Sequence, residues 1–330
     1  MSSNNKIKAV LLFSGGLDSI IVVQLLKREE IDVFPLFCSS LFWKSENAIK
    51  AAEKLNLDLK IIDISKDIWD KVKKPKYGRG KGVNPCIDCK IVMFKKAKQY
   101  MEEIKAHFVA TGEVLGERPM SQRAEAMKII SQESGLNDLL VRPLSAKLLP
   151  PTIPEKKGWI KRENLLDISG RSRKRQLELI KRWNIDFFPS PGGGCILTDP
   201  VFSRRVRDLL KYNPGAGIDE AMLLKLGRHF RLSKSVKLVV GRNKEENEKL
   251  KKLLSSGDLL LKAEGIPGPI AILRGKKISP LILKIASGIT LRYSDALENS
   301  MQEVKVISDG KEITVVARKF SAEEVKKWMI

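Results

Sequence analysis

The stretch that decides the fold lies near the start of the chain and reads Ala9-Val10-Leu11-Leu12-Phe13-Ser14-Gly15-Gly16-Leu17-Asp18-Ser19. The apolar run that opens it predicts a buried strand of a parallel sheet, and the apolar run from Ile20 to Leu26 predicts a helix. The two glycines between them permit a tight turn. A strand, a short Gly/Ser loop and a helix N-terminus together gather backbone N–H groups that bind an anion. The loop has neither G-x-x-x-x-G-K-[ST] nor G-x-G-x-x-G, so it is neither a Walker A site nor a dinucleotide fingerprint.

Strand-like and helix-like segments alternate through the first part of the chain, as in a doubly wound α/β sheet. Ligands bind such sheets at the carboxyl ends of the strands, so residues 14–19, 38–42 and 111–113 are expected around one crevice. The proline-rich segment from Pro143 to Pro154 is interpreted as an extended connector. Helices are predicted over 20–28, 46–55 and 91–104, and strands at Ala9–Phe13, Asp32–Phe37, Leu59–Ile64, His107–Thr111 and Leu139–Arg142.

The pattern changes beyond residue 200. A basic helix is expected over Val201–Leu210, and short strands with tight turns follow from Lys225 onward. Asp309-Gly310 is a hairpin signal between two strand-like runs. We therefore expect two domains, a doubly wound, mostly parallel α/β domain at 1–200 and an α+β domain at 201–330. Strands of the second are predicted at Lys237–Val240, Leu259–Lys262, Ile270–Leu273, Glu303–Ser308 and Ile313–Ala317.

The composition indicates a globular, strongly basic protein. Lys and Arg number 61 against 39 Asp and Glu, a formal net charge of +22, which favours a polyanionic partner such as nucleic acid. No run approaches the ~20 apolar residues of a membrane-spanning helix, and the segment Met1–Asn5 lacks the apolar core of a signal peptide. We expect a cytoplasmic protein without a membrane partner, whose four cysteines are not disulfide-bonded.

Three of the cysteines stand in unusual contexts. Cys86-Ile87-Asp88-Cys89 comes just before an amphipathic pattern, and Cys195 follows Gly192-Gly193-Gly194. A C-x-x-C pair on a turn presents two thiolates to one centre, and a glycine-rich loop lets a third approach. Four interpretations of these cysteines stay open. They are a [4Fe–4S] cluster on Cys86, Cys89 and Cys195, a metal-free persulfide pair of Cys195 with Cys86 or Cys89, a zinc site, and buried free thiols. Cys38 is interpreted as a small buried residue at a strand end.

The string Ser14-Gly15-Gly16-Leu17-Asp18-Ser19 resembles the PP-loop of the N-type ATP pyrophosphatases, whose fold is HUP-like. Members of that superfamily hold the pyrophosphate of ATP in this loop and activate a substrate as its adenylate. The resemblance implies that ATP binds at Ser14, Gly15, Gly16, Leu17, Asp18 and Ser19. Asp18 would help hold a Mg²⁺ ion that neutralises the developing charge.

The PP-loop, Asn84-Pro85-Cys86-x-x-Cys89 and a distant Gly-Gly-Cys together are similar to the tRNA-thiolating branch of the superfamily. That branch includes the MnmA-type 2-thiouridylases and the ThiI-type 4-thiouridine synthetases, and the resemblance covers roughly residues 6–200. The segment 110–122 resembles the T-G-E-x-x-G…S-Q stretch of the 4-thiouridine enzymes, which implies a nucleotide-site role for Thr111, Gly112 and Glu113. Members with three such cysteines use a [4Fe–4S] cluster, which implies Cys86, Cys89 and Cys195 as its ligands. Neither a ferredoxin-like and THUMP pair nor an MnmA-like barrel pattern is recognisable.

The C-terminal part resembles the NFACT-R module, which is associated with RNA-binding quality-control proteins. The resemblance rests on the dispersed strings Gly227-Arg228-His229-Phe230, Val240–Asn243, Glu246-Asn247 and Gly257-Asp258-Leu259.

Together these features predict an ATP-dependent tRNA sulfurtransferase that adenylates a base carbonyl, of uridine in the first instance, and replaces its oxygen by sulfur. Sulfide or a persulfide carrier would donate the sulfur, and a homodimer is compatible with the pattern. Catalysis would rest on Cys86, Cys89, Cys195 and Asp18. Two other functional classes stay open. One is a small-molecule PP-loop ligase, and the other is an RNA-binding quality-control protein with a vestigial ATP site. The cations expected to contact RNA phosphates are Arg171, Arg173, Lys174, Arg175, Arg204 and Arg205.

Overall fold

A computed structural model describes residues 6–188, 194–298 and 300–330 of the chain. The chain divides into two compact units, Met1–Thr198 and Asp199–Ile330. Most of the glycine-rich segment before Cys195, residues 191–193, lies outside the described residues, as does the N-terminal segment 1–5.

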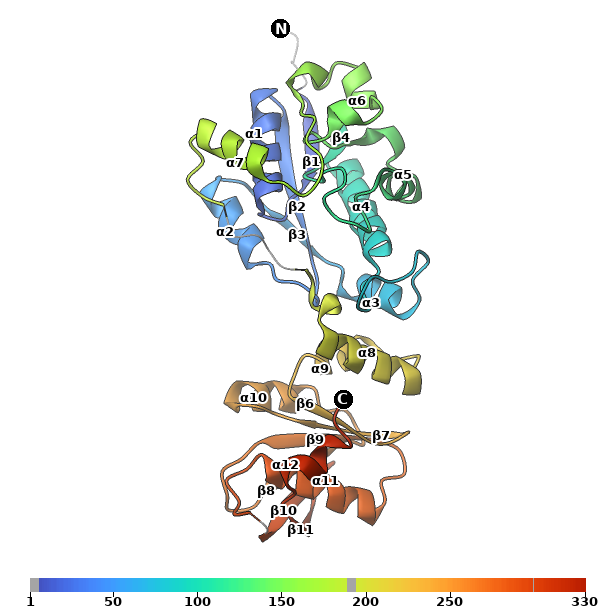
Figure 1. The fold of residues 1–330 in the computed structure, drawn as a ribbon, viewed down its shortest axis with the longest axis vertical. Coiled ribbons are helices and arrows are strands. Elements are labelled where there is room, and N and C mark those ends of the chain that lie inside the picture. The colour runs from blue at the N-terminus through green and yellow to red at the C-terminus, as the bar shows by residue number, and fades with distance from the viewer. Residues whose placement is uncertain (1–5, 189–193, 299) are drawn as a thin grey trace. The chain divides into compact units, whose positions relative to one another are not determined.

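The first unit is built on a five-stranded sheet in the order β3-β2-β1-β4-β5, and every strand pair in it is parallel (Figure 1). Helices α1 and α7 lie on one face, and α4 with α5 on the other. The predicted doubly wound α/β fold is therefore confirmed. The strands are β1 (Lys8–Leu12), β2 (Asp32–Ser39), β3 (Lys60–Asp63), β4 (Phe108–Thr111) and β5 (Leu140–Val141). The helices are α1 (Leu17–Arg28), α2 (Glu46–Lys54), α3 (Ser65–Lys73), α4 (Cys86–Glu103), α5 (Ala124–Glu133), α6 (Ile153–Lys156) and α7 (Lys174–Arg182).

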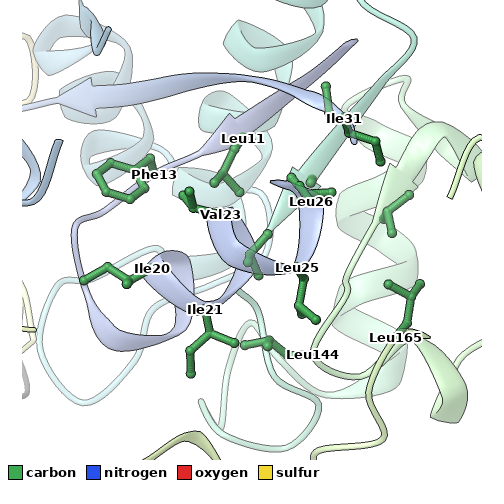
Figure 2. Close-up of a cluster of buried hydrophobic side chains, with 14 of the residues drawn as sticks. Leu11, Phe13, Ile20, Ile21, Val23, Leu25, Leu26, Ile31, Leu144 and Leu165 are labelled. Atoms are coloured by element: carbon green, nitrogen blue, oxygen red, sulfur yellow. The ribbon is translucent and has the colours of Figure 1, made fainter. Parts of the chain in front are cut away.

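The core of this unit follows from the alternation of side chains along β1. Leu11 and Phe13 point to the face covered by α1, where they pack with apolar residues of that helix, including Ile20 and Leu26 (Figure 2). Helix α1 is apolar nearly all round, because it is enclosed between the sheet and α7.

The order of the strands in the sheet determines where a ligand site is expected. The chain runs outward from β1 through β2 to β3, then crosses to β4 on the other side of β1. The carboxyl ends of β1 and β4 therefore flank a topological switch point, where open α/β sheets bind their ligands. The register pairs Leu12 of β1 with Thr111 of β4, so the segments that follow these two residues leave the sheet side by side.

Two local predictions for this unit are wrong. Helix α4 begins at Cys86 rather than near residue 91, because the apolar periodicity that indicates a helix appears only after its first turn. The segment 143–154 is not an extended connector. It contains a 3₁₀ turn at Ala146–Leu148 and buries Leu144 and Ala146 in the core, because its backbone hydrogen-bonds to residues 166 and 168.

The second unit has a six-stranded antiparallel sheet in the order β11-β10-β8-β9-β7-β6. Helix α11 packs on it, and a Cβ at Gly288 would lie 2.8 Å from the Arg318 carbonyl oxygen, so glycine permits this close packing. The predicted C-terminal α+β fold with antiparallel sheet is confirmed. The strands are β6 (Arg228–Ser233), β7 (Val236–Val240), β8 (Leu259–Ala263), β9 (Ile270–Gly275), β10 (Met301–Ser308) and β11 (Lys311–Arg318). The helices are α8 (Pro200–Tyr212), α9 (Ile218–Leu223), α10 (Lys244–Lys252), α11 (Pro280–Arg292) and α12 (Ala322–Lys326).

Within the described residues, none of these helices combines the length and the apolar character that a membrane crossing requires.

Candidate ATP and thiol site

The loop after β1 is a tight turn that depends on glycine. Gly15 has a φ of +71°, and a Cβ there would lie 2.3 Å from the backbone oxygen of Asn47. Ser19 Oγ donates a hydrogen bond to the Gly16 carbonyl (2.8 Å), and the Gly16 N–H donates to Ser14 Oγ (3.3 Å). Helix α1 begins directly after the loop, so the loop stands at a helix N-terminus, as an anion site requires.

The segment after β4 lies against this loop. A Cβ at Gly112 would lie 2.9 Å from the backbone nitrogen of Ser19, so the absence of a side chain permits the contact. Thr111, the last residue of β4, is buried beside it. The structure thus brings Thr111 and Gly112 together with the loop residues 14–19.

Asp18 supplies the acidic group of the loop. Its carboxylate accepts a hydrogen bond from Gln176 Nε2 of α7 (3.3 Å). Burial and the nearby charge of Glu117 raise the pKa of Asp18 to about 6, against the opposing effects of Gln176, Arg173 and Arg118. Oxygen ligands suit Mg²⁺, and Asp18 is the loop residue that would hold the ion.

The C-x-x-C pair lies on the first turn of α4. Cys86 begins that helix and accepts a hydrogen bond from Asn84 Nδ2 (3.1 Å). Cys89 follows one turn later and is buried. Spacing of three residues puts both thiols on the same side of the helix.

Backbone hydrogen bonds bring the segment of Cys195 to this turn. The Val83 N–H donates to the Leu197 carbonyl (3.0 Å), and the Ile196 N–H donates to the Phe42 carbonyl (3.1 Å). The third cysteine is therefore held near the first two, although it is distant in the sequence.

The three thiols affect one another's ionisation. Burial, followed by the charges of Cys86, Cys195 and Asp88, raises the pKa of Cys89 far above its usual value. Burial and the charge of Cys86 also raise the pKa of Cys195. Among residues 6–188, 194–298 and 300–330, however, no three His, Cys, Asp or Glu side chains are grouped to hold a metal ion. The cysteines as placed do not fit a preformed metal centre.

Arg118 lies near both the anion loop and the thiol of Cys195. Its positive charge acts to lower the pKa of both Asp18 and Cys195, so it lies near both groups. Its side chain is exposed, and its backbone N–H donates to Gln122 Oε1 (2.9 Å). Asp18 of the anion loop and Cys195 therefore lie near the same cation.

Glu113 is engaged in a buried ionic network. Its carboxylate is 1% exposed, accepts a hydrogen bond from Arg142 Nε (3.0 Å) and lies 3.3 Å from Lys90 Nζ. Of the three expected nucleotide-site residues Thr111, Gly112 and Glu113, it is the one whose side chain is held in buried ion pairs.

The cations expected to contact RNA have different surroundings. Arg171 and Lys174 are exposed, and Arg173 lies 3.6 Å from Glu117. Arg175 pairs with Asp167 at 2.6 Å. In the second unit Arg204 is exposed on α8, whereas Arg205 donates to the carbonyls of Leu224 (2.9 Å) and Gly227 (3.0 Å).

Sequence reasoning missed Gln176, Arg118 and the role of Asp88. Gln176 is separated from its partner Asp18 by 158 residues, and nothing local identifies it. Asp88 lies in the first turn of α4, where the helix dipole by itself favours an acidic side chain, so its place in the sequence does not identify a partner. It is 2% exposed, and its carboxylate accepts from the backbone N–H groups of Lys76 (2.9 Å) and Tyr77 (3.1 Å).

Replacement of Asp88 by asparagine is expected to release the loop before α4. An amide has one oxygen, so one of the two backbone donors loses its acceptor, at a cost of about 1–3 kcal/mol. We expect amide hydrogen exchange at Lys76 and Tyr77 to become faster by roughly tenfold or more, at about 1.4 kcal/mol per tenfold. Asp70→Asn on α3 is the matched control. Unchanged exchange at both amides would contradict the assigned role of Asp88.

Two family models match parts of the chain. The family described as "tRNA methyl transferase HUP domain" matches residues 7–133, and the one described as "NFACT protein RNA binding domain" matches residues 227–329. The chain is thus similar to PP-loop proteins in its first unit and to an NFACT-R module in its second.

Curated relatives and a solved structure also match parts of the chain. A tRNA-specific 2-thiouridylase MnmA of Limosilactobacillus reuteri (strain DSM 20016) is 31% identical over 127 residues, 34% of each chain. The enzyme of the same name from Proteus mirabilis (strain HI4320) is 26% identical over 196 residues, 53% of each chain. The match thus spans between a third and about half the length of these relatives. The crystal structure of a 4-thiouridine synthetase–RNA complex with bound ATP aligns at 22% identity and TM-score 0.35, covering 54% of this chain and 51% of that one.

Proposed function

We propose that the protein is an ATP-dependent tRNA sulfurtransferase acting in the cytoplasm, which activates a base carbonyl, of uridine in the first instance, as its adenylate. One observation carries the proposal. Cys195 and Asp18 of the anion loop at the β1/β4 switch point both lie near the cation Arg118, and the charges of Cys86 and Cys195 both act on Cys89, so the three cysteines lie near one another. A ligase that only activates a carboxylate has no use for three thiols at that place. The similarity to 2-thiouridylases supports the same assignment.

The loop residues Ser14–Ser19 would bind ATP by its β- and γ-phosphates. Their backbone N–H groups at the start of α1 suit the leaving pyrophosphate, and Asp18 would hold Mg²⁺. The bound ion supplies charge neutralisation as pyrophosphate leaves. The base oxygen attacks the α-phosphorus, an O–P bond forms, and the bond from that phosphorus to the bridging oxygen breaks.

Sulfur transfer would use a pair of the cysteines. A persulfide on one of them attacks the activated carbon, so that a C–S bond forms, the C–O bond breaks and AMP leaves. The persulfide proton passes to solvent. The thiolate of a second cysteine then attacks the first cysteine's sulfur, which breaks the S–S bond to the base sulfur and leaves a thiocarbonyl and a cysteine disulfide. A persulfide-carrying donor supplies the sulfur, and a thiol reductant restores the cysteines.

The target base has to reach the crevice, so it lies in a loop of the tRNA or leaves the stack. Arg171, Arg173 and Lys174, at the start of α7, are close to the Asp18 loop through Gln176 and would contact phosphates there. Such contacts position the tRNA and do not read its sequence.

Pyrophosphate release by anaerobically purified protein, with and without unmodified bulk tRNA and sulfide, tests the proposal. We expect release to depend on tRNA, by about tenfold or more, since adenylation needs the acceptor oxygen. Equal release of pyrophosphate with and without tRNA would instead indicate a small-molecule ligase. Absence of release from folded protein would indicate an RNA-binding protein without catalysis.

Whether the cysteines also take up a [4Fe–4S] cluster is measured on the same preparation. Iron and acid-labile sulfide near four of each per chain would support the cluster, whose ligands are then the three cysteines. Metal-free protein that thiolates tRNA from a persulfide donor would support the cysteine pair. The mass of the protein in solution tests the expected homodimer.

A further inference from the structure

The sheet of the second unit has two edges, β6 and β11, and they differ in their protection (Figure 1). The C-terminal segment covers the β6 edge. The Arg231 N–H donates a hydrogen bond to the Trp328 carbonyl (2.8 Å), and the Ile330 N–H donates to the His229 carbonyl (3.0 Å). A register shift between Arg231 and Ser233 also makes β6 irregular. Edges covered or interrupted in this way do not pair with other chains.

Strand β11 has neither form of protection. It pairs with β10 in one continuous register, from Met301 with Arg318 to Ser308 with Lys311. Among the described residues, no backbone hydrogen bond reaches the side of β11 that faces away from β10. A long, regular edge strand without a cover is suited to pairing with a strand of another chain.

The hairpin between β10 and β11 determines which backbone groups face outward. Asp309 and Gly310 both have positive φ values, +45° and +79°, as a two-residue type I′ turn requires. The residues that flank such a turn, Ser308 and Lys311, form a hydrogen-bonded pair, and bonded and non-bonded pairs then alternate along the hairpin. The odd-numbered residues from 311 to 317 therefore bond to β10. The even-numbered residues direct their N–H and C=O groups outward, and they are Glu312, Thr314, Val316 and Arg318.

This row of outward groups is self-complementary. When a second β11 lies antiparallel to the first, hydrogen-bonded pairs form between outward residues only. A single register uses all four of them. It pairs Glu312 with Arg318 of the second copy and Thr314 with Val316, and the twofold axis passes through Val315. A carboxylate then faces a guanidinium at both ends of the interface, which is a favourable cross-strand pair.

The neighbouring charges extend this complementarity. The Glu312 carboxylate lies 2.9 Å from Lys305 Nζ, which in turn lies 3.2 Å from the Glu264 carboxylate. Arg318 forms an ion pair with Glu324. Contact between Glu312 and Arg318 of the second copy would join these pairs into one row of alternating charges. Networks of this kind contribute more than isolated exposed ion pairs do.

The apolar side chains of β11 suit the same arrangement. Ile313, Val315 and Ala317 alternate onto the face that carries the core of this unit, where Val315 and Ala317 pack. Ile313, however, is 55% exposed. In the register above, the two Val315 side chains meet at the axis and Ile313 lies beside Ala317 of the second copy. Pairing therefore covers Ile313 and joins the two apolar faces.

We propose that the chain forms a twofold dimer in which β11 pairs antiparallel with β11 of a second copy, with Val315 at the axis. The interface is isologous, so it closes on itself and leaves no free β11 edge for further chains. The inference is independent of the proposed sulfur transfer, because it needs neither ATP nor the cysteines.

Sedimentation velocity of the full chain over a range of concentrations tests the dimer. The wild type is expected to reach twice the monomer mass of 37.1 kDa. Glu312→Arg places arginine opposite Arg318 at both ends, and Arg318→Glu places glutamate opposite Glu312. Each variant alone should dimerise about tenfold more weakly or worse, since like charges across an interface are costly. An equal mixture of the two variants regains opposite charges at both ends and should dimerise as the wild type does.

Glu245→Arg on α10 is the matched control for the charge variants. It makes the same change in net charge as Glu312→Arg, at an exposed position of a helix that packs on β9. We expect it to dimerise with wild-type affinity. A mixture of Glu312→Arg and Arg318→Glu that stays monomeric would contradict the proposed register.

Thr314→Pro tests the backbone part of the interface. Proline removes an outward N–H and leaves the hydrogen bonds to β10 in place, as an edge strand tolerates. This variant should be monomeric at concentrations where Thr314→Ala, which keeps the N–H, is dimeric. Far-UV circular dichroism checks that it is folded, and the charge variants decide the question if it is not. A wild type with the mass of one chain at every concentration, or a dimer that all these variants leave intact, would overturn the proposal.

Discussion

Each of the variants Cys86→Ala, Cys89→Ala and Cys195→Ala is expected to lower sulfur transfer to tRNA, in at least two cases by about 10³-fold or more. Removal of a nucleophile that forms a covalent intermediate abolishes sulfur transfer through that intermediate rather than slowing it. Pyrophosphate release in the presence of tRNA should persist in all three, because the anion loop lies on another segment, between β1 and α1. Thiolated nucleosides are measured by mass spectrometry of digested tRNA, and pyrophosphate by a coupled assay.

Cys38→Ala is the matched control for these variants. Cys38 is a buried cysteine of β2, and burial raises the pKa of its thiol to about 12, so it stays a neutral thiol near physiological pH. We expect this variant to thiolate tRNA at the wild-type rate. If Cys38→Ala loses as much activity as the other three variants, their loss of sulfur transfer would be due to disturbed packing rather than to missing thiol chemistry.

The pattern among the three variants separates the remaining alternatives. A persulfide pair needs Cys195 and one of Cys86 and Cys89, so one single variant should keep substantial activity. A [4Fe–4S] cluster needs all three, and each variant should then also lose iron. Full thiolation of tRNA by all three variants would mean that none of the three cysteines is needed for sulfur transfer.

The anion loop was predictable because its determinants are local. An apolar strand, two glycines and an apolar helix lie within one continuous stretch, and α1 begins only three residues before the predicted start. The approach of Gly112 to Ser19 agrees with the predicted crevice around residues 14–19 and 111–113, because ligands bind such sheets at the carboxyl ends of the strands, whereas the strand order itself was not predicted.

The surroundings of the site were not predictable, because their determinants are distant in the sequence. Gln176 reaches Asp18 because α7 packs on α1, and the backbone of Val83 hydrogen-bonds to Leu197, which is distant from it in the sequence. Proline content suggested a connector at 143–154, but the side chain of Leu144 is buried in the core. Burial of this kind depends on tertiary packing, which local composition does not report.

Replacement of Glu113 by glutamine is expected to destabilise the first unit by about 3–5 kcal/mol at pH 7, the usual cost of breaking a buried ion pair. The change leaves Arg142, 8% exposed, facing an amide instead of a carboxylate, with Lys90 beside it. Four of the five tryptophans belong to this unit, so their fluorescence during urea unfolding reports chiefly on it. Glu103→Gln, at an exposed position on α4, is the control and should leave the urea midpoint unchanged.

The destabilisation should depend on pH in a direction that follows from the ionisation of Glu113. Burial alone would raise the pKa of Glu113, but the charges of Lys90 and Arg142 outweigh it and hold the pKa below its ordinary value. A carboxylate with a lowered folded-state pKa stabilises the protein above its unfolded-state pKa of about 4.3, and this contribution is lost as the pH falls through the folded-state value. The gap in urea midpoint between wild type and Glu113→Gln should therefore be full at pH 7 and close under acid conditions, when Glu113 is neutral in both states. A gap that stays constant down to acid pH would mean that shape, rather than charge, determines the contribution of Glu113.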